Sequence, residues 1–161
     1  METPSTLKTG LIVVGVVGVV FISSLFAPRR EMNGGGCGPR ALLAVARTFG
    51  TSMTEAQTLA LFPRQGDTVS LAQLQRAAPK LGLSGTVRGM TPAQLRDEKP
   101  LGVLHIDDVH FVAAVGYSGD FVLIVDPFYR GETKPVRWFL DDLASRWDGA
   151  ILTLTSRKGR K

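Results

Sequence analysis

Cys37, the single cysteine of the chain, is the residue best suited to act as a nucleophile. A helix is predicted to begin at Cys37, because Pro39 suits the first helical turn and apolar residues follow at helical spacing. Unpaired backbone N–H groups at a helix N-terminus favour an anion, so they lower the pKa of a thiol placed there. The alternative is a small, buried, inert cysteine. The glycines on both sides of Cys37 make burial under bulky neighbours less natural.

A histidine and an aspartate could activate this thiol. His110 begins one predicted strand and Asp126 ends the next. A five-residue loop at 116–120 would pair Val115 with Phe121 and set His110 directly opposite Asp126, at a Cβ separation of about 4.5–5.5 Å. A two-residue loop would instead offset the pair by three positions and place the two side chains on opposite faces. The alternative interpretation takes His110 as a strand-end histidine and Asp126 as the start of an Asp-Pro turn.

The elements that must position these residues are helices first and strands afterwards. Helices are predicted from Cys37 to about Gly50, from a capping box at Ser52–Glu55 to near Pro63, after another box at Ser70–Gln73 with an interruption at Pro79, and after Thr91. Strands are predicted at 85–88, 101–106, 109–116, 121–125 and 150–155, with a helix at 138–146 before the last strand. This order indicates an α+β domain, with N-terminal helices packed on an antiparallel sheet. A thiol at a helix start facing an imidazole–carboxylate pair on that sheet is the papain-like arrangement of nucleophile, base and orienting group.

An apolar segment precedes this domain. Residues 9–28 carry no charge, and twenty helical residues rise roughly 30 Å, enough to cross a bilayer. We predict a single transmembrane helix within residues 1–29, followed by the globular domain at 30–161 with a basic C-terminal tail; a cleaved signal peptide is the alternative. Arginines follow the segment whereas only Lys8 and the amino terminus precede it, which favours a cytoplasmic domain over one on the periplasmic or extracytoplasmic side.

The composition excludes other classes of function. The chain has 161 residues, of which 44% are hydrophobic and 20% charged, which indicates one globular domain rather than a disordered or multi-span protein. The net charge of +5 is scattered without a recognised RNA-binding motif, so no nucleic-acid partner is expected. One cysteine and two histidines, His105 and His110, are too few for a disulfide framework or a Cys-rich or His-rich metal centre. We expect neither a metal nor a cofactor.

The sequence resembles peptidase family C39, the bacteriocin-processing cysteine peptidases fused to peptide-exporting ABC transporters. The resemblance covers roughly residues 31–155 and rests on CGPRALLAVARTFG at 37–50, PLGVLH at 100–105, HFVAAVG at 110–116 and VLIVDP at 122–127. It implies a papain-like fold in which Cys37 is the nucleophile, His110 the general base and Asp126 the group that orients the base. His105 matches a second family histidine that is not catalytic. The family cleaves leader peptides after a Gly-Gly pair within the cytosol.

Two departures from the family qualify this expectation. Glu31 stands where the family places a glutamine that donates to the oxyanion, and Asn33 could substitute as the donor. With no ATPase or multi-span segment in the chain, we expect an anchored domain that works with a separate exporter or a larger membrane complex. A peptidase acting on a peptide or Gly-Gly leader is the main hypothesis. A catalytically impaired domain that binds a peptide or serves as an accessory subunit is the alternative, and a papain-like acyltransferase would share the same residues.

Overall fold

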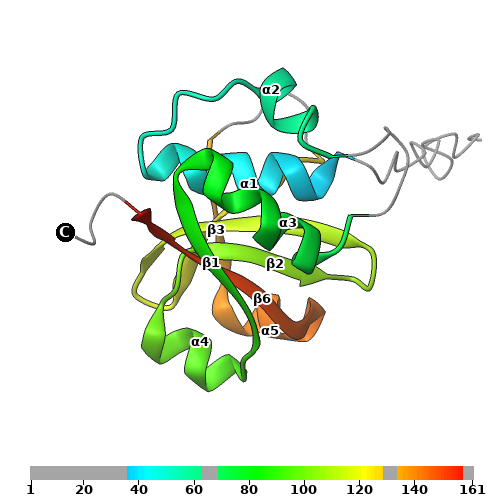
Figure 1. Ribbon diagram of the computed structural model, residues 1–161. Helices are drawn as coiled ribbons and strands as arrows, with labels where there is room; N and C mark the ends of the chain where they lie inside the picture. Colours follow the sequence, from blue (N-terminus) through cyan, green and yellow to red (C-terminus); the bar gives the residue numbers. More distant parts are fainter. Residues whose placement is uncertain (1–35, 63–68, 129–133, 158–161) are drawn as a thin grey trace, which may run out of the picture. The chain divides into compact units, whose positions relative to one another are not determined.

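The computed structural model describes residues 36–62, 69–128 and 134–157 (Figure 1). The predicted transmembrane segment at 9–28 and the two predicted oxyanion residues, Glu31 and Asn33, lie outside the described residues. Within the described ranges, no helix combines the length and the apolar character that crossing a membrane requires.

The described chain folds as the α+β domain that its sequence predicts. The helices are α1 (Cys37–Thr48), α2 (Glu55–Leu59), α3 (Leu71–Ala77), the 3₁₀ helix η2 (Ala78–Leu81), α4 (Pro92–Glu98) and α5 (Leu140–Arg146). The strands are β1 (Leu83–Gly89), β2 (Gly102–Ile106), β3 (His110–Ser118), β4 (Phe121–Val125), β5 (Val136–Phe139) and β6 (Trp147–Ser156). They form one antiparallel sheet in the order β1-β6-β2-β3-β4-β5. The predicted antiparallel sheet is therefore confirmed.

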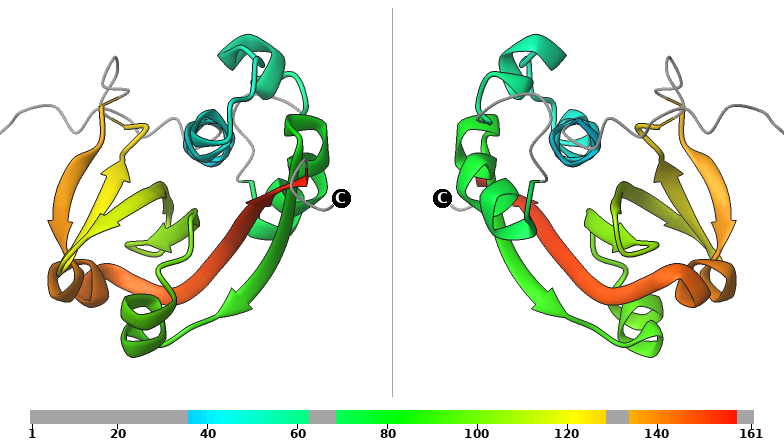
Figure 2. Two further views of the ribbon diagram at one scale, coloured as in Figure 1. Left: turned by 90° about the vertical axis from the view of Figure 1, so that its left-hand side faces the viewer. Right: turned by 90° about the vertical axis from the view of Figure 1, so that its right-hand side faces the viewer.

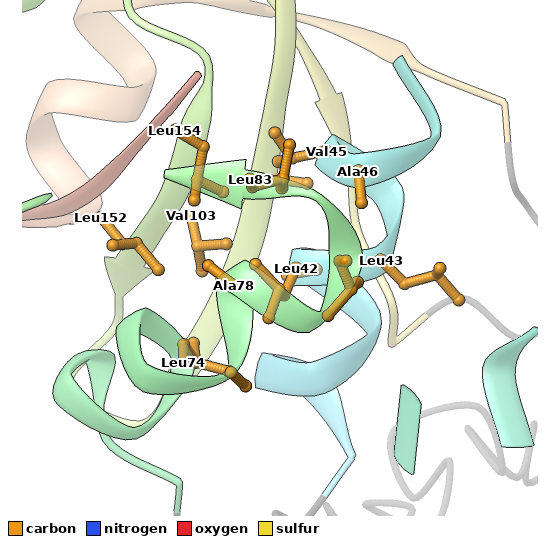
Figure 3. Close-up of a cluster of buried hydrophobic side chains, with 14 of the residues drawn as sticks. Leu42, Leu43, Val45, Ala46, Leu74, Ala78, Leu83, Val103, Leu152 and Leu154 are labelled. Carbon is orange, nitrogen blue, oxygen red and sulfur yellow. The ribbon is translucent and has the colours of Figure 1, made fainter. Parts of the chain in front are cut away.

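The sheet separates two hydrophobic clusters. On one face α1 and α3 pack on β1, β2, β3 and β6 through the first cluster (Figures 1 and 2). Figure 3 shows this cluster, to which α1 contributes Leu42 and Val45, α3 contributes Leu74 and β2 contributes Val103. On the other face α5 packs on the sheet through Leu140 and Leu143. Burial of large apolar side chains on both faces gives the sheet a fixed position between the helices.

Helix α1 is held by its buried stripe. Ala41, Leu42, Val45 and Ala46 are fully buried, at the i, i+1, i+4 and i+5 positions that one side of a helix presents. Because this stripe faces β2 and β3, the axis of α1 and the place of its first residue are fixed against the sheet. The core packing therefore determines where Cys37 lies.

Local signals at the other helices are confirmed in part. The capping boxes at Ser70–Gln73 and Thr91–Gln94 are present, and the helix that contains Pro79 tightens to 3₁₀ at Ala78 as the proline requires. The box predicted at Ser52–Glu55 is wrong. Helix α2 instead begins after Thr54, whose side chain accepts from the backbone N–H of Gln57.

The end of α2 and the start of α5 also differ from the prediction. Helix α2 ends at Leu59 rather than near Pro63. The helix predicted at 138–146 begins only at Leu140, because residues 136–139 form the edge strand β5 on β4. Strand β5 is exposed along most of its length, so its sequence lacks the apolar alternation that marks a half-buried strand.

Candidate active site

Cys37 is the first residue of α1, and its side chain is half-buried. The preceding residue, Gly36, has no side chain to cap the helix, so the N–H groups of the first turn remain available to an anion. The glycine after the cysteine allows close packing. A Cβ atom at Gly38 would lie 3.3 Å from the Phe111 ring and 3.4 Å from Leu74, so a side chain there would crowd these two neighbours. This close approach brings the Cys37 thiol to the beginning of β3.

His110 and Asp126 form a buried pair beside the thiol. His110 Nε2 lies 2.7 Å from Asp126 Oδ1, and the two side chains are 10% and 9% exposed. Asp126 Oδ1 also accepts the backbone N–H of Phe128 at 2.9 Å. The Phe128 ring stands edge-on to the imidazole, with their centroids 6.1 Å apart. The carboxylate and the aromatic ring together fix the orientation of the imidazole.

The structure reaches this pairing by a route different from the predicted one. The predicted five-residue loop at 116–120 is wrong, because β3 continues to Ser118 and only Gly119 and Asp120 join it to β4. Gly119 takes a φ of 58°, which glycine adopts without steric cost. A two-residue loop by itself would leave His110 and Asp126 three positions out of register, on opposite faces.

A β-bulge corrects the register. Ala114 pairs with Ile124, but the next pair is Gly116 with Leu123, so β3 carries one extra residue at Val115. The bulge reduces the offset between His110 and Asp126 from three positions to two, which returns the side chains to one face as diagonal neighbours. The prediction that they lie directly opposite is wrong, whereas the predicted imidazole–carboxylate contact is present.

The pKa values of the three groups shift together. Burial raises the pKa of the Cys37 thiol, but hydrogen bonds with the His110 side chain and the backbone N–H groups of Phe111 and Gly38 outweigh burial and hold this pKa below its ordinary value. Burial lowers the pKa of His110, yet hydrogen bonding and charge attraction to Asp126 and Cys37 raise it to about 9. Burial raises the pKa of Asp126, but the hydrogen bonds from His110 and the Phe128 N–H lower it overall. The shifts favour a thiolate, an imidazolium and a carboxylate side by side.

This arrangement can perform acyl transfer. With Nε2 on Asp126, Nδ1 is the ring nitrogen left to face the thiol, so one imidazole links nucleophile and carboxylate. A thiolate is the reactive form of cysteine, and an adjacent imidazolium can protonate a leaving amine. Among the described residues, no group of three or more His, Cys, Asp or Glu side chains is arranged to hold a metal ion.

The second histidine has its own partner. His105 on β2 contacts Asp148 through Nδ1, and its ring packs on Phe111 with centroids 5.0 Å apart. Asp148 Oδ1 also accepts the backbone N–H of Ala150 at 2.8 Å. These contacts tie β2 to the irregular start of β6 and keep His105 in a separate pair from His110.

Two charged residues that sequence reasoning missed lie close to the pair. Asp107 is in the turn that leads into His110, and Arg146 at the end of α5 binds it. The charge of Arg146 also contributes to the low pKa of Asp126. The Asp107-Asp108 doublet, separated from His110 by Val109 alone, is the signal in the sequence that could have pointed to this turn.

Comparison with known proteins assigns the family. Residues 27–159 match the Peptidase C39 family, so the chain belongs to this family of cysteine peptidases. The resemblance seen in the sequence is thereby confirmed. No curated protein matches the chain.

Several solved structures share its fold. A double glycine motif protease from an AMS/PCAT transporter, solved in complex with its leader peptide, is 21% identical, with a TM-score of 0.65 over 78% of this chain and 88% of that one. The peptidase domain of Streptococcus ComA, a bifunctional ABC transporter of a quorum-sensing pathway, is 20% identical, with a TM-score of 0.64 over 78% and 95% of the two chains. The N-terminal peptidase C39-like domain of a toxin secretion ATP-binding protein from Vibrio parahaemolyticus is 15% identical, with a TM-score of 0.56 over 74% and 96%. At these identities the likeness shows the fold.

Proposed function

We propose that this chain is a membrane-anchored cysteine peptidase that cleaves a peptide or leader-peptide substrate, with Cys37 as nucleophile, His110 as acid and base, and Asp126 as the orienting group. The observation that carries the proposal is the hydrogen-bonded connection from the thiol at the start of α1, through His110, to the buried carboxylate. Membership in the Peptidase C39 family supports it.

The reaction would proceed in two acyl-transfer steps. The Cys37 thiolate attacks the scissile carbonyl carbon, and the oxyanion that forms lies near the N–H groups at the start of α1. The His110 imidazolium then gives its proton to the leaving amine as the C–N bond breaks, which leaves a thioester on Cys37 and a neutral imidazole. His110 next takes a proton from water as the water attacks the thioester; the C–S bond breaks, the carboxylic acid product leaves, and the thiolate–imidazolium pair is restored. Asp126 remains ionised throughout, because its pKa is lowered in the folded protein.

The substrate assignment rests on the relatives. One similar structure contains a leader peptide and is described as a double glycine motif protease. We infer that the substrate of this chain is also a peptide with a Gly-Gly leader, delivered to or shared with a separate exporter or larger membrane complex. Glu31 favours the alternative hypothesis of an impaired, peptide-binding domain, because an ionised carboxylate cannot donate to an oxyanion.

Direct cleavage tests the proposal. The full chain, incubated with a synthetic Gly-Gly leader peptide, should release a product that mass spectrometry places at the bond after the second glycine. Cys37→Ala should bind the peptide and release none. Binding without cleavage by the wild-type chain and by Glu31→Gln would contradict the peptidase assignment and leave the binding function.

The membrane anchor is a separate prediction. Residues 9–28 are uncharged and long enough to span a bilayer, so the full-length protein should stay in the membrane pellet after carbonate extraction. Deletion of residues 1–29 should release the domain into the supernatant. A soluble form of the wild-type protein that begins near Pro28 would show that the segment is a cleaved signal peptide.

A further inference from the structure

Arg146 and Asp107 make a two-sided contact next to His110. Arg146 Nε lies 3.1 Å from Asp107 Oδ1 and 3.2 Å from Oδ2, and its Nη2 also donates to Oδ2. In the opposite direction, the backbone N–H of Asp107 donates to the carbonyl of Arg146 at 2.9 Å. The guanidinium carbon lies 4.7 Å from the centre of the Trp138 ring. A planar fork matched to a carboxylate and stacked on an aromatic ring has a defined orientation, which a flexible lysine cannot reproduce.

The turn that Arg146 binds is strained. Asp107 and Asp108 have φ values of 50° and 60°, in the left-handed region that residues other than glycine seldom adopt. Val109 closes the turn, with its N–H on the Ile106 carbonyl at 3.3 Å, and His110 follows directly as the first residue of β3. Strained backbone persists only where its surroundings hold it. A relaxation at Asp107 would therefore move the next residues of the chain, His110 among them.

The contact comes from the face of the sheet opposite α1. Helix α5 packs on the second hydrophobic cluster, whereas α1 packs on the first (Figure 2). Cys37 at the start of α1 thus contacts the His110 side chain, whereas Arg146 at the end of α5 binds the turn that precedes His110. The charged and titratable groups that act on His110 or its partners are Cys37, Asp126, Asp107 and Arg146.

We propose that Arg146 is a positioning residue, whose paired contacts with Asp107 fix the turn before His110 and so hold the imidazole against Cys37 and Asp126. Its effect on peptide cleavage rests on the proposed function, but its effect on the thiol does not. If the turn loosens, His110 moves from the thiol and the pKa of Cys37 returns towards its ordinary value. Loss of a remote positive charge alone would instead leave His110 in place and strengthen its attraction to Asp126.

A substitution that keeps the charge separates these two effects. In Arg146→Lys the positive charge remains, but the bidentate fork and the stacking on Trp138 are lost. We expect the pH midpoint of Cys37 alkylation by iodoacetamide to rise by about one unit in Arg146→Lys and in Arg146→Met. With a leader peptide, kcat should fall about 10-fold while KM changes little, because misplacement of a catalytic group slows the chemical step.

Two further variants complete the experiment. Asp107→Asn tolerates the left-handed backbone but weakens the paired contact, so it should raise the midpoint in the same direction, and its effect should not add to that of Arg146→Lys. The control is Arg96 of α4, which makes an exposed ion pair with Asp141 of α5, the helix that also carries Arg146. Arg96→Met removes this ion pair and should leave the midpoint of Cys37 alkylation unchanged. Thermal unfolding of each variant reports whether the fold is retained.

Two outcomes would overturn the inference. If Arg146→Lys had the same alkylation profile as the wild-type protein, only the positive charge at position 146 would influence the Cys37 thiol. If the changes in midpoint caused by Asp107→Asn and Arg146→Lys were additive in the double variant, the two side chains would act separately. If the wild-type chain cleaves no peptide but the variants have raised alkylation midpoints, the proposed function is refuted and the inference is supported. The failure of one can therefore be distinguished from the failure of the other.

Discussion

Replacement of His110 by alanine should lower kcat/KM for cleavage of a leader peptide by about 10³-fold. The variant loses the group that stabilises the Cys37 thiolate and the group that protonates the leaving amine, because one imidazole has both roles in the proposed reaction. Steady-state kinetics by chromatographic separation of the products measures the effect. The matched control is His105→Ala, which removes the other histidine–aspartate pair of the domain and should change the rate by less than about 10-fold.

The pH dependence of kcat/KM is a second test of the role of His110. The active form has a thiolate and an imidazolium, so the rate should fall at acid pH as the thiolate is protonated. It should also fall at alkaline pH as His110 loses its proton, at a pKa of about 9. The alkaline decrease should disappear in His110→Ala. Equal rates in His110→Ala and the wild-type protein would remove His110 from the proposed mechanism.

Glu31→Gln should increase the rate of cleavage near pH 7 by about 10²-fold. An acyl-transfer transition state places negative charge on the substrate oxygen, and an ionised glutamate at the oxyanion position would repel it. Glutamine restores a donor at the position where the C39 resemblance expects one. The measurement compares kcat for the wild-type chain and Glu31→Gln from pH 5 to pH 9.

The same comparison includes a control. The wild-type chain should approach the rate of Glu31→Gln at acid pH, where a protonated Glu31 can donate. Asn33→Ala should leave the Glu31→Gln rate unchanged if Glu31 occupies the oxyanion position. Identical rates for the wild-type chain and Glu31→Gln at every pH would show that Glu31 points elsewhere, and a loss of activity in Asn33→Ala would then assign the donor to Asn33.

The elements that carry the site could be predicted because their signals are local. The apolar stripe of α1 and the apolar runs of β3 and β4 each lie within a few consecutive residues, and all three elements form, although β3 ends two residues later than predicted. The start of α2 was predicted wrongly because Ser52–Glu55 and Thr54–Gln57 both fit a capping box in overlapping frames. The helix uses the second frame, and Thr58 is buried in it.

The contact between His110 and Asp126 was predicted with the wrong register. The sequence 116–120 contains two glycines and permits loops of either length, so turn composition alone could not choose between them. The bulge at Val115 depends on how β3 pairs with β2 and β4, and no local residue pattern predicts the bulge. The contact between His110 and Asp126 was predicted correctly from an incorrect loop length. The predicted five-residue loop and the observed two-residue loop with a bulge both place the two side chains on one face of the sheet.

The contact of Arg146 with Asp107 lay beyond sequence reasoning. The two residues are 39 positions apart and come from a helix end and a strand turn. Single charged residues at such places are ordinary in surface helices and turns. Only the three-dimensional structure shows that the end of α5 contacts the turn that precedes His110.

The pH dependence of Cys37 alkylation tests the central claim most directly, because it reports the thiolate without requiring a substrate. With iodoacetamide, the wild-type chain should react with a midpoint well below the ordinary thiol pKa of about 8.5, and His110→Ala should move that midpoint back towards the ordinary value. As Cys37 is the single cysteine, mass spectrometry of the intact protein gives the extent of reaction at each pH. A wild-type midpoint at the ordinary thiol pKa, unchanged in His110→Ala, would contradict the account.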